Sequence, residues 1–148
     1  MNWILKSFNE LTNKELHDIY KLRISVFVVE QNCPYLDIDG KDIDSLHFYK
    51  VEGGCIVAYS RLLPPGLSYE QPSIGRIITN PKFRGQSYGI ELMNESIKAV
   101  RERWPGKSIK IQAQSYLRSF YGSFGFIPVS EEYLEDDIPH TDMMLENS

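Results

Sequence analysis

Apolar positions at helical spacing dominate the chain from Thr12 to about Val29. Thr12 and Glu15 have the spacing of a capping box, in which a side-chain oxygen and a carboxylate three residues later satisfy the first backbone N–H groups of a helix. One helical face then carries Leu16, Ile19, Tyr20, Arg23 and Phe27. The pattern therefore predicts an amphipathic helix that begins at Thr12.

A different pattern follows in the next third of the chain. Residues 33–45 contain Pro34, Gly40 and four aspartates, which is typical of a loop. Residues 46–51 and 55–62 are β-branched and aromatic runs that are separated by a glutamate and two glycines. Such runs around a glycine turn predict a β-hairpin.

Strands and helices alternate in the second half of the chain. The elements that we expect are a strand over 74–79, a turn over 84–89, a helix up to Trp104, a strand over 109–113, a short helix over 114–124 and closing strands over 126–132 and 141–145. This order predicts one mixed α/β domain over residues 1–148, with a central twisted mixed sheet and helices on both faces.

Composition narrows the class of protein. The 148 residues carry a net charge of −4, which disfavours a polyanionic partner such as nucleic acid. Cys33 and Cys55 are too few for a disulfide framework or a cysteine-rich zinc site, and no run approaches the roughly 18 apolar residues that cross a bilayer. We expect a soluble cytoplasmic domain without metal or membrane partner. The oligomeric state stays open, with a homodimer through the outer strands as one option.

The segment 77–92 carries the clearest chemical signal. An expected strand, a turn with Gly85 and Gly89, and a helix start follow one another, so backbone N–H groups and the positive helix end point to one place. This arrangement favours an anion, most naturally a phosphate. The glycine spacing fits neither the nucleotide-hydrolase loop nor the dinucleotide fingerprint, and by itself it is equally typical of a plain turn.

The order Arg84, Gln86, Tyr88 and Gly89 resembles the pyrophosphate-binding signature of the GNAT superfamily of N-acetyltransferases. That signature is Gln or Arg, two residues, Gly, one residue, and Gly or Ala. Ser87 stands where the first signature glycine is expected, and its Cβ would crowd a phosphate or require a strained backbone.

The resemblance extends over nearly the whole chain. Residues 112–115 and 120–126 are similar to a second hallmark of this superfamily, in which a strand end and a short helix close over the cofactor. Residues 27–35, 37–40 and 138–140 are similar to those of its ElaA-type subgroup.

The resemblance implies an acetyl-CoA co-substrate and transfer of its acetyl group to a primary amine of a small molecule or peptide. It implies pantetheine beside Ile77, Ile78 and Thr79, a backbone N–H near Ile78 as oxyanion donor, and a contact from Gln114. It also implies Tyr121 as general acid. The pyrophosphate would lie on the N–H groups of Gly85, Gln86, Ser87, Tyr88, Gly89 and Ile90, beside Arg84.

Several alternatives stay open. Tyr121 also fits a packing role with Phe120 and Phe124, and the candidates for the general base are Glu30 and His140, acting directly or through a water. A domain that binds acyl-CoA without turnover is the main alternative function. A third is an enzyme related to acyl-homoserine-lactone synthases, which would use S-adenosylmethionine; Arg23, Phe27 and the early aspartates are loosely similar to those of that class.

Two acidic clusters have two interpretations. The first contains Asp37, Asp39, Asp42 and Asp44, and the second contains Glu131, Glu132, Glu135, Asp136 and Asp137. Neither glycine nor glutamate stands where a calcium loop beginning at Asp37 requires them. The clusters are either solvated loops or flanks of an acceptor entrance that attract a cationic amine. We expect Cys33 to be a packed loop thiol rather than a nucleophile.

Overall fold

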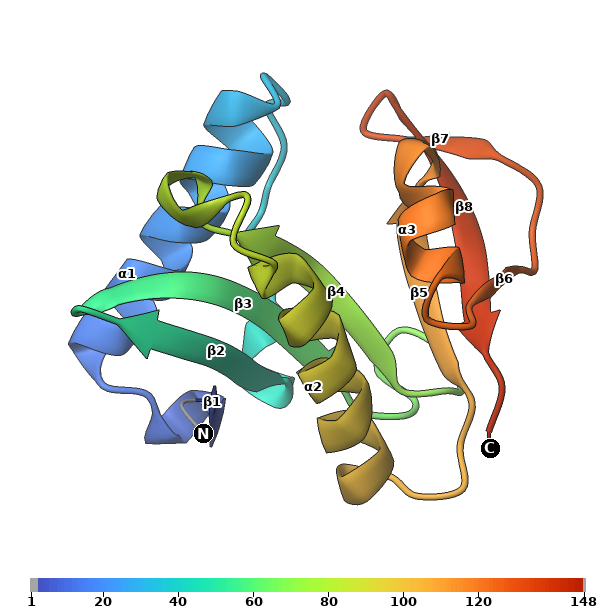
Figure 1. The fold of residues 1–148 in the computed structure, drawn as a ribbon, viewed down its shortest axis with the longest axis horizontal. Coiled ribbons are helices and arrows are strands. Elements are labelled where there is room, and N and C mark those ends of the chain that lie inside the picture. The colour runs from blue at the N-terminus through green and yellow to red at the C-terminus, as the bar shows by residue number, and fades with distance from the viewer. Residues whose placement is uncertain (1–2, 148) are drawn as a thin grey trace.

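The sheet organises the chain and provides the walls of the site (Figure 1). A computed structural model describes residues 3–147 and contains one mixed sheet in the strand order β1-β2-β3-β4-β5-β8-β6, with β7 paired to β8. Its strands are β1 Trp3–Ser7, β2 Leu46–Glu52, β3 Cys55–Leu63, β4 Ser73–Thr79, β5 Ile109–Gln114, β6 Ile127–Pro128, β7 Tyr133–Glu135 and β8 Ile138–Leu145. The β4–β5 pair is parallel, whereas the other pairs are antiparallel.

The three α-helices are α1 Asn13–Arg23, α2 Tyr88–Arg103 and α3 Arg118–Gly122. The predicted capping box of α1 is confirmed, since Thr12 Oγ1 accepts from the Glu15 N–H at 3.1 Å and a Glu15 carboxylate oxygen accepts from the Thr12 N–H at 2.8 Å. The helix continues as a π-helix, Ile24–Glu30, so the predicted helical stretch to about Val29 is also present. Short 3-10 turns cover Phe8–Glu10, Asp42–Asp44, Pro81–Phe83 and Ser115–Leu117.

Helices lie on both faces of the sheet, as predicted. The cluster around α1 joins Ile19 and Leu22 to Tyr49, Tyr59 and Ile78 of the strands. The opposite face packs against α2 and α3, and its core members are Ala58, Leu62, Ile74, Leu92, Met93, Ile109, Ile111 and Tyr121. The alternation of strand residues between two hydrophobic clusters fixes the register of the central strands.

The structure corrects the sequence-based elements at both ends of the chain. Residues 3–7 form an edge strand that the short apolar run did not reveal, because its pairing partner is β2. Near the other end, the strand expected over 126–132 is only Ile127–Pro128, since Pro128 has no N–H to donate. The helix expected over 114–124 is a 3-10 turn followed by the short α3.

A gap opens in the middle of the sheet. The ladder between β4 and β5 consists of the single pair Ser73↔Lys110, and the strands then separate toward their carboxyl ends (Figure 1). Among the described residues, no helix is long and apolar enough to cross a bilayer.

Candidate active site

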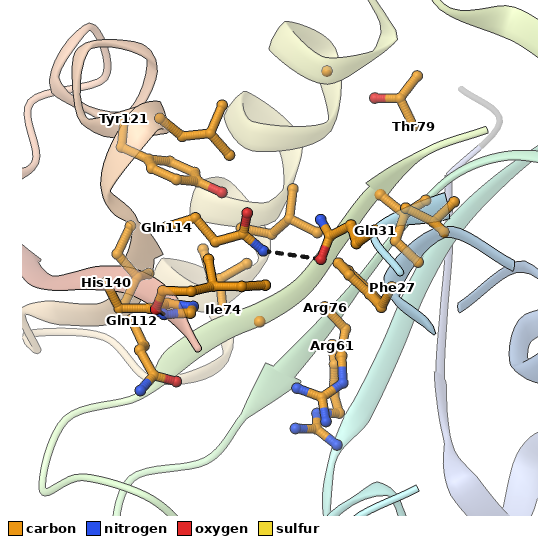
Figure 2. A pocket seen from close by; sticks show the side chains of 18 of the residues that line it. Phe27, Gln31, Arg61, Ile74, Arg76, Thr79, Gln112, Gln114, Tyr121 and His140 are labelled. Atoms are coloured by element: carbon orange, nitrogen blue, oxygen red, sulfur yellow. Dashed lines mark hydrogen bonds between the residues drawn. The ribbon is translucent and has the colours of Figure 1, made fainter. Parts of the chain in front are cut away.

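A cleft of about 1450 Å³ occupies the gap between β4 and β5. Its walls come from the π-helix and the following loop on one side, and from α3 and the β7–β8 hairpin on the other (Figure 2). The cleft joins the turn before α2 to the arginine side chains of β3 and β4. Parallel strands that separate leave backbone groups facing the gap, which is where ligands bind in many open α/β sheets.

A β-bulge shapes the β4 wall. Tyr59 pairs with Ile78 and Arg61 pairs with Gly75, so two residues of β4, Arg76 and Ile77, lie opposite one residue of β3. Arg76 has φ +48°, a left-handed conformation that is strained for a side chain of this size. Such bulges bend a strand and redirect its side chains, and here the Arg76 side chain enters the cleft.

The bulge also determines which backbone N–H groups face the gap. The Asn80 N–H donates to the Val57 carbonyl at 2.8 Å, toward β3. Because successive N–H groups of a strand alternate in direction, that of Ile78 points to β3 and those of Ile77 and Thr79 point to the gap. The N–H groups that face the gap beside Ile78 are therefore those of its neighbours and not its own.

The turn before α2 gathers unpaired donors. The first intrahelical bond runs from the Glu91 N–H to the Ser87 carbonyl, so the N–H groups of Tyr88, Gly89 and Ile90 precede it and point out of the helix end. A Cβ on Gly89 would lie 3.4 Å from Thr79 Oγ1, so the helix start lies directly against the end of β4. This end of α2 fits an anion.

Of the two outcomes expected for Ser87, the strained backbone is the one that the structure shows. Its backbone is left-handed, with φ 63° and ψ 17°, and Gly85 beside it has φ +85°. Glycine adopts this region freely, whereas another residue loses roughly 1–2 kcal/mol there. Gln86 is exposed outside the cleft lining, whereas Arg84, Gly85 and Ser87 line it.

Arg84 and Glu30 contact each other across the rim of the cleft. The guanidinium donates to both carboxylate oxygens of Glu30, at 2.8 and 2.7 Å. These hydrogen bonds lower the pKa of Glu30, so the carboxylate is a weak base in this arrangement. One residue later, Gln31 accepts from the Gln114 amide at 3.4 Å, and this bond spans the cleft (Figure 2).

Tyr121 enters the cleft from α3, with its hydroxyl directed toward Gln114 (Figure 2). Its ring packs between Phe120 and Phe126, so the packing role considered from the sequence is present too. The side chain is only 6% exposed, and burial raises the pKa of its hydroxyl. The phenol therefore keeps its proton at neutral pH.

His140 lies opposite Gln114 in the β5–β8 ladder and lines the same cleft. Its Nδ1 is 2.7 Å from the Ile138 carbonyl oxygen, which can only accept. A proton therefore sits on Nδ1, and in the neutral imidazole Nε2 carries the lone pair. The Tyr133 ring stacks on the imidazole and holds its plane.

The structure corrects both interpretations of the first acidic cluster for Asp37, Asp39 and Asp42, which pair with arginines, whereas Asp44 is exposed as expected of a solvated loop. Asp37 and Asp42 are 3% and 2% exposed. Arg23 donates to Asp37 at 2.9 Å and to Asp42 at 2.6 Å. Arg61 donates to Asp39 at 2.8 Å and to Asp42 at 3.1 Å, and Arg76 donates to Asp37 at 2.8 Å.

Three guanidiniums thus neutralise three carboxylates, and we call these six residues the arginine–aspartate cluster. The hydrogen bonds and charges hold the pKa of Asp39 and Asp42 below the usual range although burial acts against this. In the second acidic cluster all five carboxylate residues are exposed, and Glu135 and Asp136 reach the cleft.

The remaining candidates have structural surroundings. His17 is exposed on α1, whereas His47 is buried between the Tyr59 hydroxyl at 2.7 Å and the Asp42 carbonyl at 3.0 Å. The Cys33 thiol is buried and donates to the Asp136 carbonyl at 3.4 Å. Within residues 3–147, no group of three or more His, Cys, Asp or Glu side chains is placed to hold a metal ion.

Known proteins share both the sequence and the fold. A family model described as an acetyltransferase (GNAT) domain matches residues 23–147. Protein ElaA of Escherichia coli is 42% identical over 148 residues, which cover 99% of this chain and 97% of ElaA, and its crystal structure superimposes with a TM-score of 0.91. An acyl-CoA N-acyltransferase from Pseudomonas aeruginosa superimposes with a TM-score of 0.93 at 41% identity, covering 97% of this chain and 98% of that one.

A more distant likeness bears on the third interpretation. The acyl-homoserine-lactone synthase LasI superimposes with a TM-score of 0.78 at 14% identity, over 97% of this chain and 88% of LasI. At this identity the likeness shows a shared fold alone. The family model and the full-length identity to ElaA decide the assignment: this chain belongs to the GNAT acetyltransferase family, in its ElaA-type subgroup.

Proposed function

We propose that this protein transfers the acetyl group of acetyl-CoA directly to a primary amine of a small molecule or peptide. The observation that carries the proposal is the cleft between β4 and β5, which has donor N–H groups at one end and the Tyr121 hydroxyl in its wall. The gap gives an extended pantetheine arm a strand edge to pair with. The N–H groups of Tyr88, Gly89 and Ile90 suit the pyrophosphate, with Gly85, Gln86 and Ser87 forming the turn beneath it.

The chemistry that we propose begins when the neutral amine attacks the thioester carbonyl. A C–N bond forms, and the negative charge on oxygen is stabilised by an N–H of Ile77 or Thr79. The C–S bond then breaks, and Tyr121 gives its proton to the departing sulfur. The amine nitrogen loses one proton, which returns to the tyrosine through the base, so the products are the acetylated amine and the free thiol of CoA.

His140 is the base that the geometry supports. Its Nδ1 proton is held by the Ile138 carbonyl, so Nε2 is available to accept a proton. Glu30, the second candidate, is paired with Arg84 and has a lowered pKa. We therefore assign Glu30 to the control of Arg84 rather than to proton transfer.

The Glu30–Arg84 pair gives a prediction about cofactor affinity. Pyrophosphate and Glu30 compete for the same guanidinium, so Glu30→Gln frees Arg84 and strengthens acetyl-CoA binding by about 3- to 10-fold. Isothermal titration calorimetry measures this, with Glu102→Gln on α2 as the control for net charge. If His140 is the base, kcat of the Glu30 variant stays within about 2-fold of wild type. Weaker binding by the variant would contradict the assignment.

One observation favours a second function, a domain that binds acyl-CoA without turnover. Ser87 puts a side chain and a strained backbone where the family signature has glycine. The two functions are separated by measuring thermal stabilisation by acetyl-CoA and then thiol release over a panel of amines. We expect both signals. Stabilisation without thiol release from any amine would support the binding domain, and absence of stabilisation would exclude both.

A further inference from the structure

Hydrogen-bond donors without acceptors collect at the end of the cleft farthest from the turn before α2. Arg61, Arg76 and Lys41 all line the cleft there, and Figure 2 shows the Arg61 and Arg76 side chains next to each other. Arg61 is 3% exposed, and its Nε is a buried nitrogen without a hydrogen-bond partner among the described residues. A buried donor without an acceptor is rare in a folded protein and marks a place where a ligand atom or water belongs.

The other two cations also have donors to spare. Arg76 donates to Asp37 and Asp39 through Nε and Nη2, which leaves the two protons of Nη1 without an acceptor in residues 3–147. The Lys41 ammonium has three protons and a bond to Ser68 Oγ at 2.7 Å. These groups can only donate, so the complementary ligand group is one that only accepts.

The backbone at Arg76 shows that this side chain is placed at some expense in stability. Its φ of +48° at the bulge is unfavourable for arginine, yet the conformation directs the guanidinium into the cleft over the Tyr35 ring, 5.6 Å from the ring centroid. Strain of this kind persists where the surrounding structure enforces it, and it concentrates at binding sites.

The net charge of the residues around these donors does not repel an anion. Arg23, Arg61 and Arg76 balance Asp37, Asp39 and Asp42, so the wall is neutral, and Lys41 adds one positive charge at its edge. The exposed Glu135 and Asp136 line the cleft as well and suit an ammonium group. The cleft thus offers separate surroundings for a carboxylate and for an amine.

We propose that the acceptor is an amino carboxylate, a molecule whose carboxylate binds Arg76, Arg61 and Lys41 while its amino group reaches the thioester. This substrate class deepens, and rests on, the proposed acetyl transfer. Arg76 is only one residue from Ile77 and three from Thr79, the two residues whose N–H groups face the gap, so the two ends of one small molecule reach both places.

The test compares acceptors that carry a carboxylate with the matching uncharged carboxamides, at equal concentrations of the neutral amine. Glycine, β-alanine, 4-aminobutyrate and 6-aminohexanoate are each measured against the corresponding carboxamide, with thiol release giving kcat/KM. We expect at least one carboxylate to exceed its carboxamide by about 10- to 100-fold, the range for charge-assisted hydrogen bonds. The preference shrinks as salt is raised, because Lys41 and Arg76 are partly exposed.

Variants show which side chains cause the preference for a carboxylate over its carboxamide. Arg76→Gln removes most of the preference, measured as the ratio of kcat/KM for the carboxylate to kcat/KM for its carboxamide, whereas Arg76→Lys restores part of it. Lys41→Gln reduces it by a smaller factor and does not touch the buried ion pairs, so it serves if Arg76→Gln does not fold. Arg103→Gln, on α2 outside the cleft, is the control for net charge.

Each outcome separates this inference from the proposed function. Carboxamides that react as well as carboxylates overturn the inference while acetyl transfer stands. If neither set reacts, acetyl transfer fails, and calorimetric binding of N-acetyl-4-aminobutyrate decides the inference. Binding by wild type that Arg76→Gln or Lys41→Gln weakens would support the carboxylate site, and no binding, or binding that both variants retain, would overturn it.

Discussion

The two ends of the cleft are built in opposite ways. The turn before α2 presents the backbone N–H groups of three consecutive residues, Tyr88, Gly89 and Ile90, and its strain is confined to Ser87. The arginine–aspartate cluster presents side chains from α1, β3, β4 and the loop between α1 and β2, and it buries ion pairs. A substitution in the turn can therefore change ligand binding alone, whereas a substitution in the cluster changes the stability of the fold as well as binding.

The largest expected effect breaks the cluster. Asp42→Asn removes one carboxylate that accepts from Arg23 and Arg61, and it leaves buried guanidinium charge without a counter-ion. We expect a loss of about 3–5 kcal/mol in the free energy of unfolding. Urea denaturation followed by circular dichroism measures it.

The matched control is Asp18→Asn, which removes a more exposed aspartate paired with Lys14. Pairs of that kind contribute about 0–1 kcal/mol. Equal losses in the two variants would show that the cluster is not a stabilising unit.

Tyr121→Phe tests the role of the tyrosine hydroxyl in the cleft wall, between the turn before α2 and the arginine–aspartate cluster. The substitution keeps the ring and removes the hydroxyl, so we expect kcat to fall by about 100-fold or more while acetyl-CoA affinity changes little. Steady-state kinetics and calorimetry measure the two quantities. Tyr116→Phe, a 74% exposed tyrosine that also lines the cleft, should be neutral. Full activity of the Tyr121 variant from pH 6 to 9 would refute its role as acid.

Acid should weaken the arginine–aspartate cluster. Asp39 and Asp42 have lowered pKa values in the folded protein, so their stabilising contribution is complete above the unfolded pKa of about 3.9 and is lost as pH falls below it. Burial raises the pKa of Glu15, but hydrogen bonds from Lys6, the Thr12 N–H and Tyr49 outweigh it and hold the pKa at about 2.

The measurement is the free energy of unfolding between pH 7 and pH 2.5. Stability should decline below about pH 4, and the decline should be shallower in Asp42→Asn, which has one fewer carboxylate to protonate. An identical slope in both proteins would contradict the lowered pKa of Asp42.

The smallest expected effect lies at the turn. Ser87→Gly relieves a left-handed backbone that disfavours serine by roughly 1–2 kcal/mol, while the added flexibility of the unfolded chain offsets about half of this. We expect a gain of about 0.5–1 kcal/mol and acetyl-CoA binding that is up to about 3-fold tighter. Ser123→Gly, at φ −65°, should be destabilising instead. Thermal unfolding and calorimetry follow both, and a loss of stability in Ser87→Gly would contradict the strain.

Sequence reasoning succeeded where the signal is local. The α1 cap joins residues three apart, the hairpin turn is two glycines, and the 84–90 turn lies in one short segment. The left-handed Ser87 backbone follows from its place in the glycine signature. Local spacing constrains local geometry, so these features can be read before any folding of the whole chain is known.

The cluster lay beyond such reasoning. Asp37 pairs with Arg23, 14 residues before it, and with Arg76, 39 residues after it. Asp42 pairs with Arg23, 19 residues before it, and with Arg61, 19 residues after it. The aspartates therefore looked like solvated charges, because nothing near them in the sequence names their partners. The Glu30–Arg84 pair, 54 residues apart, was hidden for the same reason, although both residues were candidates. The sequence did offer one signal for the arginine–aspartate cluster. It contains three arginines without nearby acidic partners, namely Arg23, Arg61 and Arg76.

The most direct test of the account is the stoichiometry of the reaction. Purified protein is incubated with acetyl-CoA, with and without an amine acceptor, and both free CoA and N-acetylated amine are quantified by mass spectrometry. The account predicts that CoA release depends on the amine and equals the acetylated amine one to one. Release of CoA at the same rate without amine, or no release with any amine, would contradict direct acetyl transfer in this cleft.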